Sequence, residues 1–279
     1  MTTPLIITAQ NIPAAWEQSI IALYTSGDTI PTQYDVPDEP LSIDAPMLMT
    51  ITDPSAQPRI HRNFPDSREG LAQYVDDVVY GARNFMVESG SWTYSYHKRI
   101  TEYPGLSYTQ SPHGSAIGGV INQLDYILDS LAACWHTRRA QAISWVPAWD
   151  CISDEPPCFQ RLWARGTMRG EDRCLDVHLD WRSRDAYKAA FMNLYAFSAL
   201  QAWLAFQLSN RLGGAVYSGT LVDFTNSYHI YGRDVEAAGL FVARLRQRTF
   251  EKRTWQDGIV PVRVGGETVE SRDAWGVGG

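Results

Sequence analysis

The sequence predicts an α+β fold in which a mixed sheet packs against one long, buried helix. The helix is predicted over residues 185–212, where apolar residues lie on nearly all sides of each turn. A strand is predicted before it over 175–181, where apolar and polar residues alternate, and another after it over 221–231, which is rich in aromatic and β-branched residues. The chain has 279 residues, of which 44% are hydrophobic and 12% aromatic, so it can bury one substantial core.

The other elements are predicted in chain order from local pattern. Residues 1–69 are rich in proline and turn residues, and we expect them to wrap the core as loops with short strands. Because neither a repeat nor a linker divides the sequence, residues 1–279 are predicted to form a single domain, ending in a Gly-rich, flexible tail over 265–279. Apolar spacing predicts two further helices and two short strands. These are helices 70–85 and 121–133 and strands 140–146 and 161–165.

Charge and cysteine content narrow the classes of partner. The 31 acidic and 24 basic residues give a formal net charge of −7, which argues against non-specific nucleic-acid binding. No signal peptide and no apolar run long enough to span a bilayer is recognisable, so we expect a cytoplasmic protein without membrane contact. The four cysteines lack CxxC spacing, so we predict free thiols and no metal site.

Cys158 is the first candidate for chemistry. It directly follows Pro156 and Pro157, which fix the backbone, so its thiol occupies a defined position. A thiolate at such a position is a good nucleophile when cations lower its pKa. The alternative is that Cys158 is a small buried core residue.

Three arginines form the second candidate feature. Arg138 and Arg139 directly follow a predicted helix, and Arg182 follows a strand otherwise suited to burial. A guanidinium at the end of a core strand needs an anion, and phosphate fits it bidentately. Surface salt bridges are the alternative interpretation for each arginine taken singly.

Three polar residues are unusual for their predicted elements. His229 and Tyr231 lie on the same face of a strand, so both polar tips point to one place. Asn193 lies inside the apolar helix, where its amide offers the donor and acceptor that the edge of a pyrimidine requires. A helix–helix hydrogen bond would be the ordinary role of such an amide.

The order and spacing of these blocks resemble the thymidylate synthase family. Cys158 follows Arg139 at 19 positions, as in that family, and Tyr96-His97 resembles its pyrimidine nucleotide 5-hydroxymethylase branch. The resemblance covers about residues 70–233. Its blocks are Trp92-Thr93-Tyr94-Ser95-Tyr96-His97-Lys98-Arg99, Thr137-Arg138-Arg139, Trp145-x-Pro147, Pro156-Pro157-Cys158, Arg182-Ser183-x-Asp185 with Asn193, and Ser227-Tyr228-His229-Ile230-Tyr231-Gly232.

The resemblance implies a fold and a set of roles. The fold is a thymidylate-synthase-like domain that forms a homodimer through its sheet face, with phosphate-binding arginines shared across the interface. Cys158 would add to C6 of a pyrimidine nucleoside monophosphate (dCMP, CMP or dUMP), and 5,10-methylenetetrahydrofolate would be the co-substrate. The other implied roles are catalysis for Asp77 and Tyr96; 5′-phosphate binding for Arg182, Ser183 and, from the partner subunit, Arg138 and Arg139; base binding for Asn193; ribose binding for His229 and Tyr231; and folate binding for Asp185 and Trp92.

The expected product depends on departures from the family pattern. Phe159 occupies the position of the family's histidine after the nucleophile. Trp181 replaces the glutamine before the phosphate arginine, and Ser227 replaces the aspartate before the ribose histidine. Ala82 stands where methylating members carry a tryptophan that excludes water, so a 5-hydroxymethyl product is expected. The alternatives are thymidylate-synthase-type methylation of dUMP or dCMP with release of dihydrofolate, and an inactive nucleotide-binding relative.

Overall fold

The computed structural model describes residues 3–105, 119–255, 262–264 and 267–269. Its core is a mixed seven-stranded sheet, which confirms the predicted α+β class. β1 runs parallel to β3, β9 runs parallel to β10, and the other neighbours are antiparallel. The strand order is β1 (Leu5–Ala9), β3 (Ser42–Ile51), β10 (Val216–Ile230), β9 (Asp172–Asp185), β8 (Phe159–Arg169) and β7 (Gln141–Ile143), with β2 (Asp28–Ile30) paired to β3.

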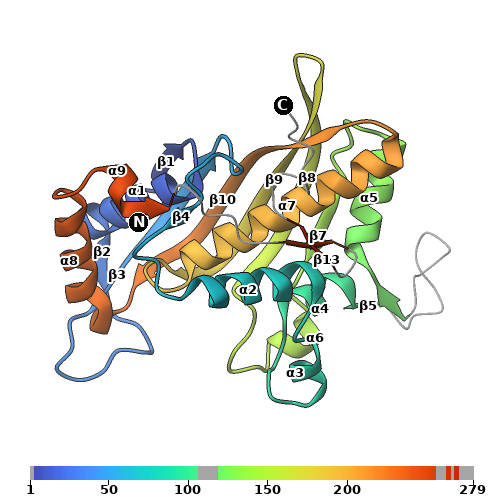
Figure 1. The fold of residues 1–279 in the computed structure, drawn as a ribbon. Helices are drawn as coiled ribbons and strands as arrows, with labels where there is room; N and C mark the ends of the chain where they lie inside the picture. Colours follow the sequence, from blue (N-terminus) through green and yellow to red (C-terminus); the bar gives the residue numbers. More distant parts are fainter. Residues whose placement is uncertain (1–2, 106–118, 256–261, 265–266, 270–279) are drawn as a thin grey trace.

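The long helix α7 (Ala190–Leu212) crosses one face of this sheet and packs on β9 and β10 (Figure 1). Most of its side chains are buried, because α2 (Arg68–Tyr80), α5 (Gln123–Ala133) and α1 (Ile12–Ser26) pack against it. Within the described ranges, no helix is long and apolar enough to cross a bilayer.

The remaining elements are short and lie around the edges of this core. They are the helices α3 (Phe85–Glu88), α4 (Tyr96–Thr101), α6 (Pro147–Asp150), α8 (Val235–Leu245) and α9 (Phe250–Arg253), the 3₁₀ turn Gly232–Asp234, and the strand pairs β4 (Ile60–His61) with β11 (Thr254–Trp255), β5 (Tyr103–Pro104) with β6 (Val120–Ile121), and β12 (Val262–Val264) with β13 (Glu267–Val269).

The N-terminal region differs from the loops predicted over 1–69. It contains α1, a helix of 15 residues, and β3, a ten-residue strand inside the main sheet. The Asn11 side chain caps α1 by accepting a bond from the Ala14 amide at 3.1 Å, and Trp16 is fully buried. Pro46 lies between the β3 segments that pair with β2 and β1, so its missing N–H breaks neither ladder.

Element boundaries also differ from the sequence predictions. The helix predicted over 70–85 ends at Tyr80, because Gly81 adopts a left-handed conformation with φ of 65°. The helix predicted over 185–212 begins at Ala190, because β9 continues to Asp185. The predicted flexible tail falls largely outside the described residues, of which it includes only 267–269, paired with β12.

Two register shifts shape the end of the sheet where the predicted site residues lie. β8 shifts against β9 between Phe159 and Arg161, and β10 shifts against β3 between Thr225 and Tyr228. A bulge of this kind bends a strand and redirects the side chains beyond it. The cysteine that precedes β8 and the histidine near the end of β10 lie next to these shifts.

Candidate active site

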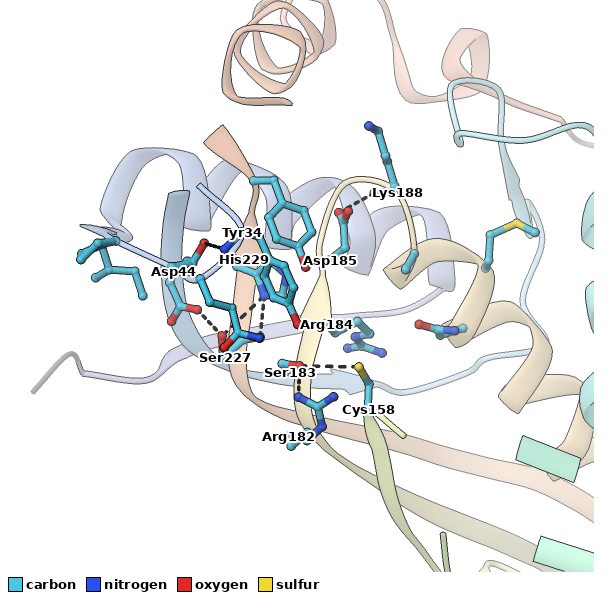
Figure 2. A pocket seen from close by; sticks show the side chains of 18 of the residues that line it. Tyr34, Asp44, Cys158, Arg182, Ser183, Arg184, Asp185, Lys188, Ser227 and His229 are labelled. Carbon is cyan, nitrogen blue, oxygen red and sulfur yellow. Dashed lines mark hydrogen bonds between the residues drawn. The ribbon is translucent and has the colours of Figure 1, made fainter. Parts of the chain in front are cut away.

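A cavity of about 710 Å³ opens at this end of the sheet, between Cys158 just before β8, the ends of β9 and β10, and the start of α7. Figure 2 shows side chains from these elements and from β3 pointing into it. Eight of the predicted site residues line it: Tyr96, Cys158, Arg182, Ser183, Asp185, Asn193, His229 and Tyr231. Among the described residues, no cluster of three or more His, Cys, Asp or Glu side chains is arranged to hold a metal ion.

Cys158 is held at the start of β8. Its carbonyl accepts a bond from the Arg182 amide at 2.9 Å, which ties it to β9. The thiol is partly exposed to the cavity, and its Sγ lies 3.6 Å from Oγ of Ser183. A thiol that reaches the cavity at a fixed position, next to a hydroxyl, is arranged as a nucleophile.

Arg182 brings a positive charge to the cavity. Its guanidinium donates to the carbonyl oxygens of Pro156 and Pro157, at 2.7 and 3.1 Å, and to Ser183 Oγ at 3.2 Å. Within the described ranges it has no carboxylate partner. Bonds to neutral carbonyls orient the guanidinium without neutralising it, so an anion in the cavity finds an oriented cation.

Asn193 projects from the first turn of α7 and is almost fully buried. Its Nδ2 donates to the hydroxyl of Tyr74 on α2 at 2.6 Å, and Tyr74 also lines the cavity. Burial raises the pKa of Tyr74 far above its ordinary value, so the phenol stays protonated. Tyr74 lies within the helix predicted over 70–85, and its position opposite Asn193 results from the packing of α2 on α7.

The end of β10, the residue that follows it and the neighbouring strand β3 supply a polar group of four side chains. His229 is 8% exposed, and its Nδ1 lies 3.1 Å from the Ser227 carbonyl, while its Nε2 has no partner among the described residues. The Tyr231 ring packs against His229, with centroids 4.6 Å apart. Ser227 donates to the Asp44 carboxylate from β3, as Figure 2 shows. Asp44 escaped sequence reasoning because it lies in a segment predicted as loop.

Asp185 and Tyr96 occupy further walls of the cavity. Asp185 accepts bonds from the amides of Tyr187 and Lys188, at 2.9 and 2.8 Å, and burial raises the pKa of its carboxyl. The Tyr96 ring packs edge-on against Phe159 and Trp181, and burial raises its pKa well above the ordinary value.

Asp77 and Trp92 line a second cavity, of about 470 Å³, which shares Tyr74 and Tyr96 with the first. Asp77 is ion-paired with Arg83, whose Nε lies 2.9 and 2.8 Å from the two carboxylate oxygens. Arg83 also lies over the Trp92 ring, 4.8 Å from its centroid. The structure therefore does not bring these two predicted residues to the wall of the Cys158 cavity.

Arg138 and Arg139 also lie outside the cavity. Both side chains are exposed, and the carbonyl of Arg138 accepts a bond from Trp163 Nε1 on β8 at 2.9 Å. In one chain, the predicted phosphate site is therefore represented by Arg182 and Ser183 alone.

A buried network that was not predicted from the sequence reaches the cavity wall through Arg184. Arg184 and Asp223 form an ion pair with almost no exposure, and Trp181 Nε1 donates to Asp223 at 2.9 Å. The Arg184 guanidinium lies over the Trp181 ring, 4.8 Å from its centroid. A lone Asp223 within an apolar strand was the available signal, because a buried carboxylate requires a partner.

The fold and the cavity define an α+β protein that combines a fixed thiol, an unpaired arginine and buried polar groups in one site. Comparison of the sequence with known proteins identifies the particular family. A model described as thymidylate synthase matches residues 76–256, more than half of the chain, and the chain belongs to this family. The reaction of the family is the transfer of a one-carbon unit from methylenetetrahydrofolate to C5 of a pyrimidine nucleoside monophosphate.

Individual relatives agree with this assignment. A protein of Methanocaldococcus jannaschii named "Putative thymidylate synthase" is 26% identical over 232 residues, which cover 81% of this chain and 90% of that protein. Proteins of the same name from Methanococcoides burtonii and Methanothermobacter marburgensis are 24% identical over 229 residues and 34% identical over 127 residues. The alignment with the M. burtonii protein covers 82% of this chain and 90% of that protein. The alignment with the M. marburgensis protein covers 46% of this chain and 52% of that protein.

Proposed function

We propose that this protein transfers a one-carbon unit to C5 of a pyrimidine nucleoside 5′-monophosphate through a covalent Cys158–C6 adduct and yields the 5-hydroxymethyl nucleotide. The observation that carries this proposal is the arrangement of Cys158, Arg182, Asn193 and His229 around one cavity. These side chains match, in order, the electrophilic ring carbon, the phosphate, the base edge and the sugar of such a nucleotide. We place the reaction in the cytosol, where the free cysteines stay reduced.

The thiol of Cys158 starts the reaction. C5 of an unmodified pyrimidine is a poor nucleophile, and addition of the thiolate to C6 breaks the ring conjugation and makes C5 nucleophilic. Ser183 Oγ, 3.6 Å from Sγ, is close enough to exchange a proton with the sulfur. Asn193 and Tyr74 face the base edge and stabilise charge that develops on the ring.

A homodimer through the sheet would complete the phosphate site. α2, α5 and α7 lie on one face of the sheet (Figure 1), and partly exposed apolar side chains, including Leu48, Trp163 and Phe224, lie on strands at the other face. The bond from Trp163 to the carbonyl of Arg138 anchors the Arg138–Arg139 segment beside this face. We propose that these two arginines reach the phosphate in the partner subunit, where they join Arg182.

The chain carries residues that fit a folate co-substrate. Methylenetetrahydrofolate, when bound, supplies the one-carbon unit. Asp185 is a partly buried carboxylate with a raised pKa, and such a group gains from the N–H donors of a pterin ring. The second cavity, which contains Trp92 and adjoins the first at Tyr74 and Tyr96, offers aromatic side chains next to it.

The position of the aromatic residues supports hydration rather than reduction of the new group. Ala82, in the place of the family's shielding tryptophan, is exposed just beyond α2. Trp92 is held under Arg83 in the second cavity and does not line the Cys158 cavity. Water can then add to the methylene that remains on C5 once tetrahydrofolate has left, and release of the Cys158 thiolate frees the 5-hydroxymethyl nucleotide.

The product distinguishes the proposal from its alternatives. UMP, dUMP, CMP and dCMP are each incubated with methylenetetrahydrofolate, and products are identified by mass spectrometry while absorbance follows dihydrofolate. We expect a 5-hydroxymethyl nucleotide without dihydrofolate, and no product from Cys158→Ser, which retains nucleotide binding. Stoichiometric dihydrofolate with a methylated nucleotide would instead identify a methylase. Nucleotide binding without any product would indicate an inactive relative.

A further inference from the structure

Three side chains lie side by side on adjacent strands at the sugar end of the cavity. His229 on β10 pairs in register with Asp44 on β3 and with Asp185 on β9. Residues directly opposite each other in a sheet project from the same face, and all three line the cavity. Asp44 is therefore the immediate neighbour of His229, although 185 positions separate them in the sequence.

His229 presents an unused acceptor. The Ser227 carbonyl, 3.1 Å from Nδ1, can only accept a hydrogen bond, so in the neutral ring Nδ1 carries the proton. Nε2 is then an acceptor, and it is buried without a partner among the described residues. A buried acceptor of this kind requires a donor, and a sugar hydroxyl in the cavity can supply one.

Asp44 offers a second acceptor beside the first. Ser227 donates to its Oδ2, and no donor to its Oδ1 is found within the described part of the chain. Burial of the carboxyl raises its pKa, which shows that its surroundings stabilise the charge incompletely. A further hydroxyl donor to Oδ1 would compensate for that lost solvation.

Two neighbouring acceptors match a sugar with two neighbouring hydroxyls. Ribose carries O–H donors at both C2′ and C3′, and a carboxylate is a common partner of the 2′-hydroxyl in nucleotide sites. Deoxyribose carries only the 3′-hydroxyl, so its C2′ methylene would leave Oδ1 of the half-buried Asp44 carboxylate without a donor. A site built to bond a hydroxyl discriminates strongly against the analogue that lacks it.

We infer that Asp44, oriented by Ser227 and adjacent to His229, selects pyrimidine ribonucleoside 5′-monophosphates over their deoxyribonucleoside counterparts. This inference rests on the proposed function, because it places the sugar of the same nucleotide at His229. The inferred selectivity is for the sugar alone, and it makes no distinction between cytosine and uracil nucleotides.

Binding of four nucleotides tests the inference without requiring turnover. Affinities of the full-length protein for CMP, dCMP, UMP and dUMP are measured by titration calorimetry. We expect the ribonucleotide of each base to bind about tenfold or more tightly than its deoxyribonucleotide, the effect of one hydrogen bond to a charged group. Asp44→Asn should weaken ribonucleotide binding about tenfold and leave deoxyribonucleotide binding within about threefold.

Asp28→Asn is the matched control. Asp28 pairs with Asp44 across β2 and β3, so its substitution removes a neighbouring negative charge, but Asp28 does not line the cavity. The sugar preference of this variant should equal that of the unmodified protein. Thermal melting of both variants verifies that they are folded, and the preference of the unmodified protein is informative without any variant.

The outcomes separate this inference from the function on which it rests. Equal affinity for ribo- and deoxyribonucleotides in the unmodified protein would overturn the inference and leave the proposed function standing. Equal weakening of both sugars by Asp44→Asn would also overturn it, because Asp44 would then only position His229. Failure of all four nucleotides to bind would overturn the proposed function, and the inference with it.

Discussion

At the scale of single residues, burial determines how the polar groups of the cavity ionise. Asp185 receives two backbone amide bonds, yet loss of solvent outweighs them and raises the pKa of its carboxyl above the ordinary value of 3.8. Asp185 therefore becomes protonated at a higher pH than an exposed aspartate. Below that pH it loses the charge that makes it a strong acceptor.

A pH dependence of folate use follows from this shift. As the pH is lowered from neutral toward the ordinary carboxyl value, protonation of Asp185 should raise KM for methylenetetrahydrofolate, measured at saturating nucleotide. Asp185→Asn should show a higher KM that is nearly independent of pH in the same range, because the titrating group is gone. An unchanged rise of KM with acid in Asp185→Asn would assign the effect to another residue.

At the scale of elements, Gly81 determines where α2 ends. Gly81 ends the helix in the left-handed region, with its amide bonded to the Asp77 carbonyl at 3.2 Å. A Cβ at this position would lie 2.4 Å from His97 Nδ1 and 2.5 Å from Asn84 Nδ2. The backbone conformation and the close approach of α4 both require glycine at this position.

Replacing this glycine should destabilise the fold measurably. Gly81→Ala combines the cost of a left-handed alanine with steric crowding, and we expect a loss of about 2–3 kcal/mol in the free energy of unfolding. Gly213→Ala is the control, since Gly213 also has φ of 65° at a helix end but no atoms lie within 4 Å of an added Cβ. It should lose only about 1 kcal/mol. Urea denaturation of both variants measures the difference, and equal losses would show that crowding by His97 is unimportant.

At the scale of the whole molecule, one chain brings only part of the predicted phosphate site together. Arg182 reaches the cavity, while Arg138 and Arg139 are exposed beside the open face of the sheet. If two chains associate through that face, each active site draws residues from both subunits, as an isologous interface allows.

Mixing two inactive variants tests this arrangement. Arg139→Ala and Cys158→Ser should each be inactive alone, because one lacks a phosphate contact and the other lacks the nucleophile. In mixed dimers, one site combines an intact Cys158 with an intact Arg139. Random exchange should therefore restore about a quarter of the normal activity. Absence of recovery after subunit exchange, demonstrated with differently tagged chains, would contradict a shared site.

The local pattern of the chain was enough to predict the α+β class, the presence of the long helix and several of the residues that line the cavity, among them Cys158, Arg182 and Asn193. Alternation and helical spacing depend on which faces are apolar, and those faces were correctly recognised for β9, β10 and α7. Cys158 and Arg182 were recognisable because a paired proline and a strand-end arginine are conspicuous in the sequence itself.

Only the tertiary structure decided how the polar residues pair. Asp44 was hidden in a proline-rich segment, since Pro46 signals a loop unless its place between two strand partners is known. Asp77 carried the expected chemical type, but Arg83 neutralises it in a neighbouring cavity, and Tyr74 faces Asn193 instead. These pairings depend on strand register and helix packing between residues far apart in the chain, and such contacts leave no local pattern in the sequence.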